Sequence, residues 1–405
     1  MKILFLTIIK INSLDERGIY SDLLKKFHDE GHEICIVCPN ERREKRGTEL
    51  NKNCNSQILK VKTLNIQKTS LIEKGLATLM IERQFLNAVK KYFSEIKFDL
   101  VLYSTPPITF SKVIEYVKKR DAAFSYLLLK DIFPQNAVDM KLIKKNGLIH
   151  KYFLHKEKKL YQLSDKIGCL SEANLEYLKK HNSYLDFKKI EINPNTITPK
   201  FLNYSSFEKE NIRLKYSIPI QKKIFVYGGN LGKPQGLDFL LETIQRIKRS
   251  DVFFLIIGSG TEFKRIQKWF EKLQPQNALL ITALPKNDYD KLLAACDVGL
   301  IFLNKNFTIP NYPSRLLSYL EMKMPVIAAT DHNTDIGMDI EKNKCGLAVI
   351  SGDSKAMQNA INNLMDNICN FNDMKVSSWN FLNRDFHVNR SFKLIMQSIN
   401  KKATI

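Results

Sequence analysis

Residues 224–236 restrict the fold more than any other stretch of this chain, because a short apolar run leads directly into a glycine-rich turn. A continuous apolar run is typical of a strand buried on both faces of a parallel sheet. Glycines follow it at positions 228, 229, 232 and 236, and glycine lets the backbone approach a ligand closely. A helix beginning near Gly236 would direct its free amides and positive end at that ligand. The expected ligand is an anion, and Lys233 adds a mobile positive charge suited to a diphosphate.

A plain strand-to-helix turn, in which the glycines serve only backbone geometry, explains the same spacing equally well. Other segments must therefore decide between the two interpretations.

Apolar runs alternate with helical periodicity along the whole chain, which predicts two open parallel sheets of the α/β class. With 405 residues, 44% of them hydrophobic, the chain is long enough for two domains with full cores. Residues 206–220 are charged and lack clear periodicity, so we expect them to link the two halves. Strands are expected at 2–9, 33–38, 57–62, 99–107 (ending in a Pro-rich turn), 123–129 and 166–170 in the first half, and at 223–228, 252–257, 278–282, 297–302 and 325–329 in the second.

The seven cysteines are odd in number and scattered, which favours a reducing compartment without a disulfide framework. Cys35 and Cys38 have the spacing of metal ligands, but they lie in or beside the apolar run 34–37 and no second pair follows at a suitable distance. We therefore interpret them as two core thiols of a strand and expect no zinc site.

The formal net charge of +21 is unevenly distributed. Residues 51–200 carry 27 Lys and Arg against 14 Asp and Glu, whereas residues 1–50 are balanced at nine of each. Such an excess favours an anionic partner for the first half: nucleic acid, an acidic membrane surface or a phosphorylated lipid. General solubility of a lysine-rich chain is the alternative.

No apolar run approaches the roughly 20 residues needed to span a bilayer, so any membrane contact should be peripheral. The apolar start over 2–9 is short, lacks a cleavage site and is followed by Lys10, which indicates a first strand rather than a signal peptide. Residues 70–93 have the spacing of an amphipathic helix with lysines toward its ends. A helix that faces the core is the alternative for this segment.

Two further positions fall where ligands bind in open α/β sheets, at the carboxyl ends of strands. Gly18 opens the first helix, so a second set of free amides should face that edge. Asp131 follows the strand 123–129 and is a functional candidate, although it could simply cap the next turn.

Several motifs in this order resemble retaining glycosyltransferase family 4, and the nearest subgroup is the bacterial surface-polysaccharide (O-antigen and capsule) transferases. In the second half the resemblance is carried by residues 229–236, 256–260, 313–319 and 325–326; in the first half it is carried by residues 17–18, 31–33, 130–134 and 192–195. The similarity covers nearly the whole chain.

The resemblance implies a GT-B fold, with two Rossmann-like domains facing each other across a cleft. The acceptor-binding domain would span 1–205 and the nucleotide-sugar domain 221–385, joined by the linker 206–220. A C-terminal helix within 386–405 would return to the first domain.

The implied activity is transfer of a sugar from a nucleotide-diphosphate sugar, with a UDP-sugar as the expected donor, to a polyprenyl-diphosphate-linked saccharide with retention of configuration. Such an enzyme would work in the cytoplasm, peripherally on the inner face of the cell membrane, in lipopolysaccharide or capsule synthesis. Its partners would be the donor, the lipid-linked acceptor and an anionic membrane surface, with no nucleic acid. Neither a metal nor another cofactor is expected.

The resemblance also assigns roles to residues. Lys233, Arg315 and the amides around Gly18 and 229–232 would stabilise the charge of the leaving diphosphate. Asp131 would orient the acceptor hydroxyl, so Asp131 and Lys233 are the candidate catalytic residues. The donor-binding candidates are Gly18, Gly229, Asn230, Gly232, Lys233, Gly258, Gly260, Leu284, Ser314, Arg315 and Ser318, and the acceptor-binding candidates are Arg17, Lys130 and Asp131.

The chain departs from the family pattern at the donor site. Many members carry two glutamates eight positions apart, and those places are Pro310 and Ser318 here; Glu321 lies one helical turn further and is not taken as a substitute. Many members also have Arg and Lys where this chain has Asn230 and Gln235.

Asp288 and Asp290 could suggest a magnesium site, but they fall in an expected helix over 286–295, where residues two apart do not share a face.

Two other functions stay open. A non-hydrolysing sugar-nucleotide epimerase can share this fold and donor loop. A nucleic-acid-binding protein would use the same positive charge, but the basic residues lack interleaved aromatics in a recognisable pattern.

Overall fold

The computed structural model describes residues 1–53, 55–66 and 69–403. They form two compact units, unit 1 comprising Met1–Thr198 with Val388–Ile405 and unit 2 comprising Pro199–His387. Among the described residues, no helix is both long and apolar enough to cross a membrane.

Unit 1 contains an eight-stranded sheet in the order β3-β4-β2-β1-β5-β6-β7-β8. All of its pairings are parallel except β3 with β4. The polar segment that follows β2 therefore contributes an antiparallel edge strand. The strands are β1 (Lys2–Leu6), β2 (Glu33–Glu41), β3 (Glu49–Asn53), β4 (Ser56–Thr63), β5 (Leu100–Ser104), β6 (Phe124–Leu129), β7 (Lys166–Cys169) and β8 (Ile190–Ile192).

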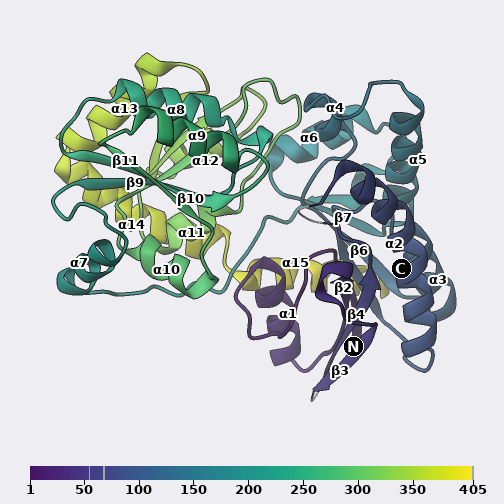
Figure 1. Cartoon of the computed structure of the whole chain (residues 1–405). Helices are drawn as coiled ribbons and strands as arrows, with labels where there is room; N and C mark the ends of the chain where they lie inside the picture. Colours follow the sequence, from purple (N-terminus) through teal and green to yellow (C-terminus); the bar gives the residue numbers. More distant parts are fainter. Residues whose placement is uncertain (54, 67–68, 404–405) are drawn as a thin grey trace. The chain divides into compact units, whose positions relative to one another are not determined.

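Helices cover both faces of this sheet (Figure 1). One face carries α1 (Ile19–Asp29) and α15 (Val388–Ala403), which meet through the rings of Phe27 and Phe392 at 4.8 Å between centroids. The other carries α2 (Leu71–Tyr92), α3 (Ser111–Asp121) and α5 (Leu148–Leu163), and the remaining helices are α4 (Gln135–Asp139) and α6 (Glu172–His181). Short 3₁₀ turns are η1 (Arg42–Glu44) and η2 (Phe187–Lys189).

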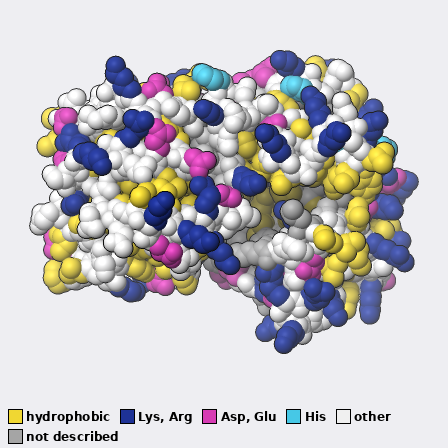
Figure 2. All heavy atoms as spheres, turned by 45° about the horizontal axis from the view of Figure 1, so that its top comes forward, with side chains coloured by type: hydrophobic (Ala, Val, Ile, Leu, Met, Phe, Trp, Pro, Cys, Tyr) yellow, Lys and Arg dark blue, Asp and Glu magenta, His cyan; other side chains and the backbone are white. Residues whose placement is uncertain are grey.

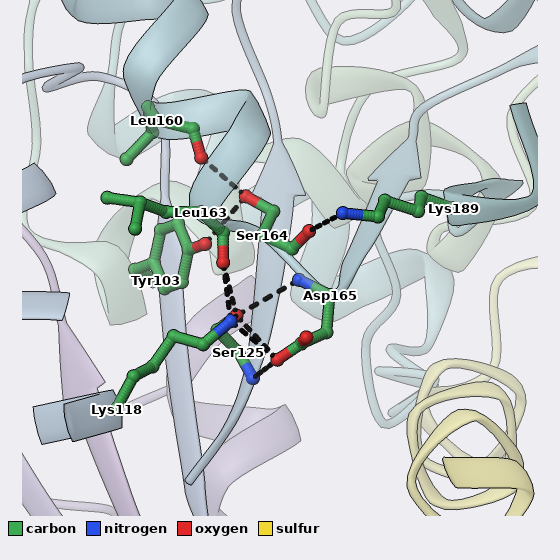
Figure 3. A network of polar contacts seen from close by, with 8 residues as sticks. All are labelled: Tyr103, Lys118, Ser125, Leu160, Leu163, Ser164, Asp165 and Lys189. Carbon is green, nitrogen blue, oxygen red and sulfur yellow. Dashed lines mark hydrogen bonds and ion pairs between the residues drawn. The ribbon is translucent and has the colours of Figure 1, made fainter. Parts of the chain in front are cut away.

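A polar network holds the end of α5 against β6 and α3 (Figure 3). Asp165 accepts a hydrogen bond from the backbone N–H of Ser125 at 2.9 Å and pairs with Nζ of Lys118 at 2.8 Å. The hydroxyl of Ser164 donates to the carbonyl of Leu160 at 2.8 Å. Because the polar groups of this network find partners, their hydrogen bonds offset part of the cost of removing them from water, and the network orients α5 on the sheet.

Unit 2 contains a six-stranded parallel sheet in the order β11-β10-β9-β12-β13-β14. Its core is built from strand residues such as Phe225 and Phe254 and from helix residues such as Leu240 and Ile361. The strands are β9 (Lys223–Asn230), β10 (Val252–Ser259), β11 (Ala278–Thr282), β12 (Val298–Phe302), β13 (Val326–Thr330) and β14 (Gly346–Ile350). The helices are α7 (Ser206–Lys215), η3 (Lys233–Gln235), α8 (Leu237–Arg246), α9 (Phe263–Leu273), α10 (Lys286–Ala294), α11 (Arg315–Glu321), α12 (Ile336–Lys342), α13 (Ser354–Asp366) and α14 (Ile368–Asp385).

The segment 206–220, expected to be a linker, differs from that expectation. It contains the helix α7 and belongs to unit 2. Ser205 and Glu208 form a reciprocal capping box that starts the helix, and Arg213 pairs with Asp297 at 2.8 Å. None of the α7 side chains is fully buried. A helix is usually recognised in a sequence by the apolar stripe that it buries, and this segment has no such periodic stripe.

Cys35 and Cys38 are buried in β2, as the strand interpretation predicts. Burial raises the pKa of the Cys38 thiol to about 11, which keeps it protonated at neutral pH.

Candidate active site

The glycine-rich segment of unit 2 begins inside a strand. β9 runs through Asn230 instead of ending at residue 228 as predicted, and Gly229 and Asn230 pair with Gly258 and Ser259 of β10. The N–H of Leu231 still donates to the carbonyl of Ser259, at 2.9 Å. The two glycine motifs therefore lie side by side at the carboxyl edge of the sheet, where open α/β sheets bind ligands.

Backbone packing accounts for two of these glycines. A Cβ atom at Gly258 would lie 2.0 Å from the carbonyl oxygen of Gly229, and one at Gly260 would lie 2.3 Å from that of Leu231. The steric interpretation therefore applies to both positions.

Gly229 differs from Gly258 and Gly260. It is exposed and has φ +122°, a backbone conformation that other residues rarely adopt. The nearest atom to a Cβ built there belongs to the guanidinium of Arg315, at 3.7 Å. At Gly229 an exposed backbone segment therefore lies within van der Waals reach of a cation.

Arg315, the first residue of α11, is the most specifically placed of the predicted donor residues. Its guanidinium lies over the ring of Tyr227, with 4.3 Å between Cζ and the ring centroid. Nη2 donates to Oε1 of Gln235, whereas Nη1 is buried without a hydrogen-bond partner among the described residues. Burial lowers the pKa of Arg315, but the neighbouring Tyr227 and Tyr319 hydroxyls outweigh this and raise it, so the cation is retained.

An unpartnered buried N–H is costly, and a ligand oxygen would satisfy it. The Arg315 side chain can therefore donate to an anion without giving up a hydrogen bond.

Sequence analysis missed the tyrosines that support this arginine. Tyr319 lies one helical turn after Arg315, accepts from the N–H of Gly228 at 3.0 Å and donates to the carbonyl of Leu300 at 3.1 Å. The hydroxyl of Tyr227 donates to the carbonyl of Asn230 at 2.9 Å. The spacing of Arg315 and Tyr319 on one helix face was the only available signal, because their partners on β9 and β12 are distant in sequence.

The other predicted donor residues of unit 2 differ in how exposed they are. Lys233 is exposed, and its carbonyl accepts from Nδ2 of Asn304 at 3.4 Å. Asn230 and Ser314 are exposed, Ser318 and Leu284 are half-buried, and Gly232 is buried.

Glu321 has a structural role. It is 1% exposed, and its carboxylate accepts from the backbone N–H of Lys200 at 2.7 Å. This carboxylate is held in the interior of unit 2 by a backbone hydrogen bond.

Asp288 and Asp290 lie in α10, as predicted, and Asp290 is buried and pairs with Lys286. Within the described part of the chain, no cluster of three or more His, Cys, Asp or Glu side chains is arranged to hold a metal ion.

The predicted acceptor residues lie in unit 1, and two of them, Lys130 and Asp131, directly follow β6. The hydroxyl of Thr105 accepts from the N–H groups of Lys130 at 3.1 Å and Asp131 at 3.2 Å, and donates to the carbonyl of Asp131 at 3.0 Å. The Asp131 carboxylate accepts from Nδ2 of Asn136. Burial raises the pKa of Asp131 to about 6 and lowers the pKa of Lys130 to about 7. Both groups can therefore change charge near neutral pH.

The first helix offers fewer free amides than the sequence suggests. The N–H of Gly18 donates to Oδ1 of Asp22 at 3.1 Å, and the other carboxylate oxygen of Asp22 accepts from the N–H of Thr198 at 2.7 Å. The Gly18 amide is thus already satisfied by a carboxylate within unit 1. Arg17 is half-buried beside it.

The structure places the predicted site residues in two sets. Arg17, Gly18, Lys130 and Asp131 belong to unit 1, and all the others belong to unit 2.

Part of the chain is similar to known glycosyltransferases. Residues 208–375 match the family described as glycosyl transferases group 1. The chain is 24% identical over 310 residues to the probable glycosyltransferase WbjE of Pseudomonas aeruginosa, covering 75% of this chain and 73% of that protein.

Two solved structures cover nearly all of the chain. HepE from Anabaena in complex with UDP-glucose has a TM-score of 0.71 at 14% identity, over 99% of this chain and 100% of that one. WaaG, a glycosyltransferase involved in lipopolysaccharide biosynthesis, has a TM-score of 0.68 at 12% identity, over 97% and 99%. These likenesses confirm the predicted α/β GT-B fold with two parallel-sheet domains.

Proposed function

We propose that the protein transfers a sugar from a UDP-sugar to a lipid-linked saccharide, with retention of the anomeric configuration, in the synthesis of a surface polysaccharide. The observation that carries the proposal is the closeness of exposed Gly229 to Arg315, whose buried Nη1 has no hydrogen-bond partner among the residues that the structure describes. This pair lies in the part of the chain that matches glycosyl transferases group 1, at the carboxyl edge of a parallel sheet.

The choice of donor and pathway rests on the relatives. HepE was solved with UDP-glucose, and WaaG acts in lipopolysaccharide biosynthesis. A diphosphate also suits the site, because the planar guanidinium of Arg315 presents parallel N–H groups to phosphate oxygens.

In the proposed reaction, the bond between the anomeric carbon and the diphosphate oxygen breaks, and the acceptor oxygen bonds to the same face of that carbon. The acceptor proton passes to the departing diphosphate. Arg315 and Lys233 stabilise the negative charge that grows on the leaving group, which lowers the barrier more than it stabilises the bound donor. Asp131 orients the acceptor hydroxyl by accepting its hydrogen bond. No metal is required by this scheme.

Donor binding can be tested by thermal unfolding with UDP-, GDP-, ADP- and dTDP-sugars. A ligand at 100 times its dissociation constant adds about 2.7 kcal/mol to the free energy of unfolding. We expect UDP-sugars to raise the melting temperature most. If only a sugar of another nucleotide stabilises the protein, that nucleotide would be assigned as the donor in place of UDP. If none does, the donor site would be refuted.

Product analysis separates transfer from epimerisation. With the stabilising donor and a membrane lipid extract, we expect labelled sugar to enter the lipid fraction, and nuclear magnetic resonance of the product should show the donor's anomeric configuration. Free epimerised nucleotide sugar without a glycoside would instead identify an epimerase. The inverted anomer would refute retention.

A further inference from the structure

Two helices on the same face of unit 1 leave apolar side chains uncovered. On α2, Ile72 is 80% exposed, and Leu76, Leu79 and Met80 are also exposed. The opposite side of that helix buries Ile81, Phe85 and Val89 in the core, so these exposed residues form a second apolar side. The described residues of unit 1 leave this second side uncovered.

The other helix is α5, together with the loop before it. Leu148 is 86% exposed and Ile149 is 62% exposed, and Leu142, Tyr152 and Leu154 are exposed as well. Single exposed aliphatic side chains are common on protein surfaces, but a contiguous group of them marks an interaction surface.

The two helices are neighbours. Nζ of Lys156 on α5 lies 2.9 Å from Oε2 of Glu82 on α2, and both side chains are largely buried. Both helices connect parallel strands of one sheet, so they run in the same direction and present their N-terminal halves at the same end. The exposed apolar residues occur mainly in these halves, so the geometry gathers them into one surface, which we call the α2–α5 surface.

Positive charge accompanies this surface. Lys141, Lys144, Lys145 and Lys151 are exposed around Leu148, and no Asp or Glu occurs between residues 140 and 156. Figure 2 shows hydrophobic side chains interspersed with Lys and Arg side chains over unit 1. Exposed aliphatic residues mixed with lysines suit the boundary between lipid headgroups and acyl chains, where lysines reach the phosphates and Leu and Ile enter the apolar layer.

We propose that the α2–α5 surface docks reversibly on an anionic lipid bilayer. Protein interfaces favour aromatic residues and Arg and are depleted in Lys, whereas this surface is rich in Lys, Leu and Ile. A nucleic acid would contact the lysines but leave the aliphatic side chains in water. This proposal rests on the proposed function and adds the place where the transfer would occur, because a lipid-linked acceptor lies in the same bilayer.

The docking is tested by sedimentation with vesicles, in the absence of donor and acceptor. We expect the protein to sediment with vesicles of phosphatidylcholine and phosphatidylglycerol at 7:3 in low salt, to be released in high salt, and to bind pure phosphatidylcholine weakly. Equal binding to both kinds of vesicle, or binding to neither, would overturn the proposal.

Matched variants test the location of the surface. Lys144→Gln, Lys145→Gln and Lys151→Gln together should weaken partition onto anionic vesicles on the order of 100-fold, since each lysine near such a membrane contributes roughly a factor of five. The control removes the same charge from exposed lysines of α9, as Lys264→Gln, Lys268→Gln and Lys272→Gln, and should change binding less than about threefold. Equal losses in the two triple variants would show a diffuse charge effect and overturn the assignment.

The apolar contribution is tested by Leu148→Ser with Ile149→Ser, against Ile368→Ser of unit 2, which is 72% exposed in the parent. Only the first variant should weaken binding at high phosphatidylglycerol content. Light scattering is measured in parallel, because conversion of a dimer to a monomer by the first variant would show that a second copy occupies the surface instead. Stabilisation by UDP, measured without vesicles, should be unchanged in every variant, so failure of docking and failure of donor binding give different results.

Discussion

Replacement of Arg315 by glutamine tests the core of the donor site. The substitution removes the cation and both Nη donors but keeps a planar side chain able to contact Tyr227. In the parent protein, Nη2 already binds Gln235, while Nη1 is buried and has no partner in the described part of the chain, so the unliganded site loses little when the guanidinium is removed. The contact between the guanidinium and the ring is worth about 0.5–2 kcal/mol, and relief of the unpartnered N–H offsets part of that loss.

The liganded site should lose more. A hydrogen bond to a charged group contributes about 1.5–3 kcal/mol, and each 1.4 kcal/mol changes affinity tenfold. We therefore expect Arg315→Gln to weaken UDP binding roughly 10- to 100-fold while the melting temperature of the unliganded protein changes by only a few degrees. The UDP affinity of Arg315→Lys should fall between that of the parent protein and that of Arg315→Gln, because lysine keeps the charge but not the parallel N–H groups.

Isothermal titration with UDP at fixed ionic strength measures the effect. Arg246→Gln is the matched control, because Arg246 is an exposed arginine in the last turn of α8 and pairs only with Glu242 among the ion pairs of the described residues. Unchanged UDP affinity in a folded Arg315→Gln variant, or an equal loss in the control, would refute the role of Arg315.

Four further results are expected. Lys233→Ala should lower turnover tenfold to a thousandfold with the fold intact, because its charge is needed most in the transition state; unchanged turnover would contradict this. Transfer should survive EDTA, whereas loss on chelation and recovery with magnesium would show that a metal stabilises the leaving group.

Since burial raises the pKa of Asp131 to about 6, kcat/KM should fall as the pH drops through 6, and Asp131→Asn should remove this limb of the pH profile; a limb that persists belongs to another group. Burial also raises the pKa of Glu157 from its ordinary 4.5 to about 7. The folded state therefore binds a proton that the unfolded state has released between these values, and stability is lost as the pH rises through 7. Glu157→Gln should stabilise the protein by on the order of 2 kcal/mol at pH 8 and little at pH 4.5 in urea unfolding, and an equal effect at both would argue against the titration.

Local patterns were sufficient to predict the fold class and the edge of the sheet that carries the glycine motifs. Buried parallel strands can be recognised in a sequence as apolar runs. The glycines of β9 and β10 lie near the carboxyl end of the pairing between these two strands. Cys35 and Cys38 were assigned to a strand for the same reason. Arg315 was identified from its motif, and the structure places it beside Gly229.

Tertiary structure decided which groups are free to act. The amide of Gly18 already donates a hydrogen bond to Asp22, and the carboxylate of Glu321 accepts one from the N–H of Lys200, 121 positions away. Residues 70–93 were predicted to be helical from their apolar spacing, but that spacing does not reveal that Ile72 and Leu76 lack cover while Phe85 is buried. The physical reason is that burial and hydrogen-bond satisfaction depend on which distant segments pack together, whereas periodicity reports only which residues share a face.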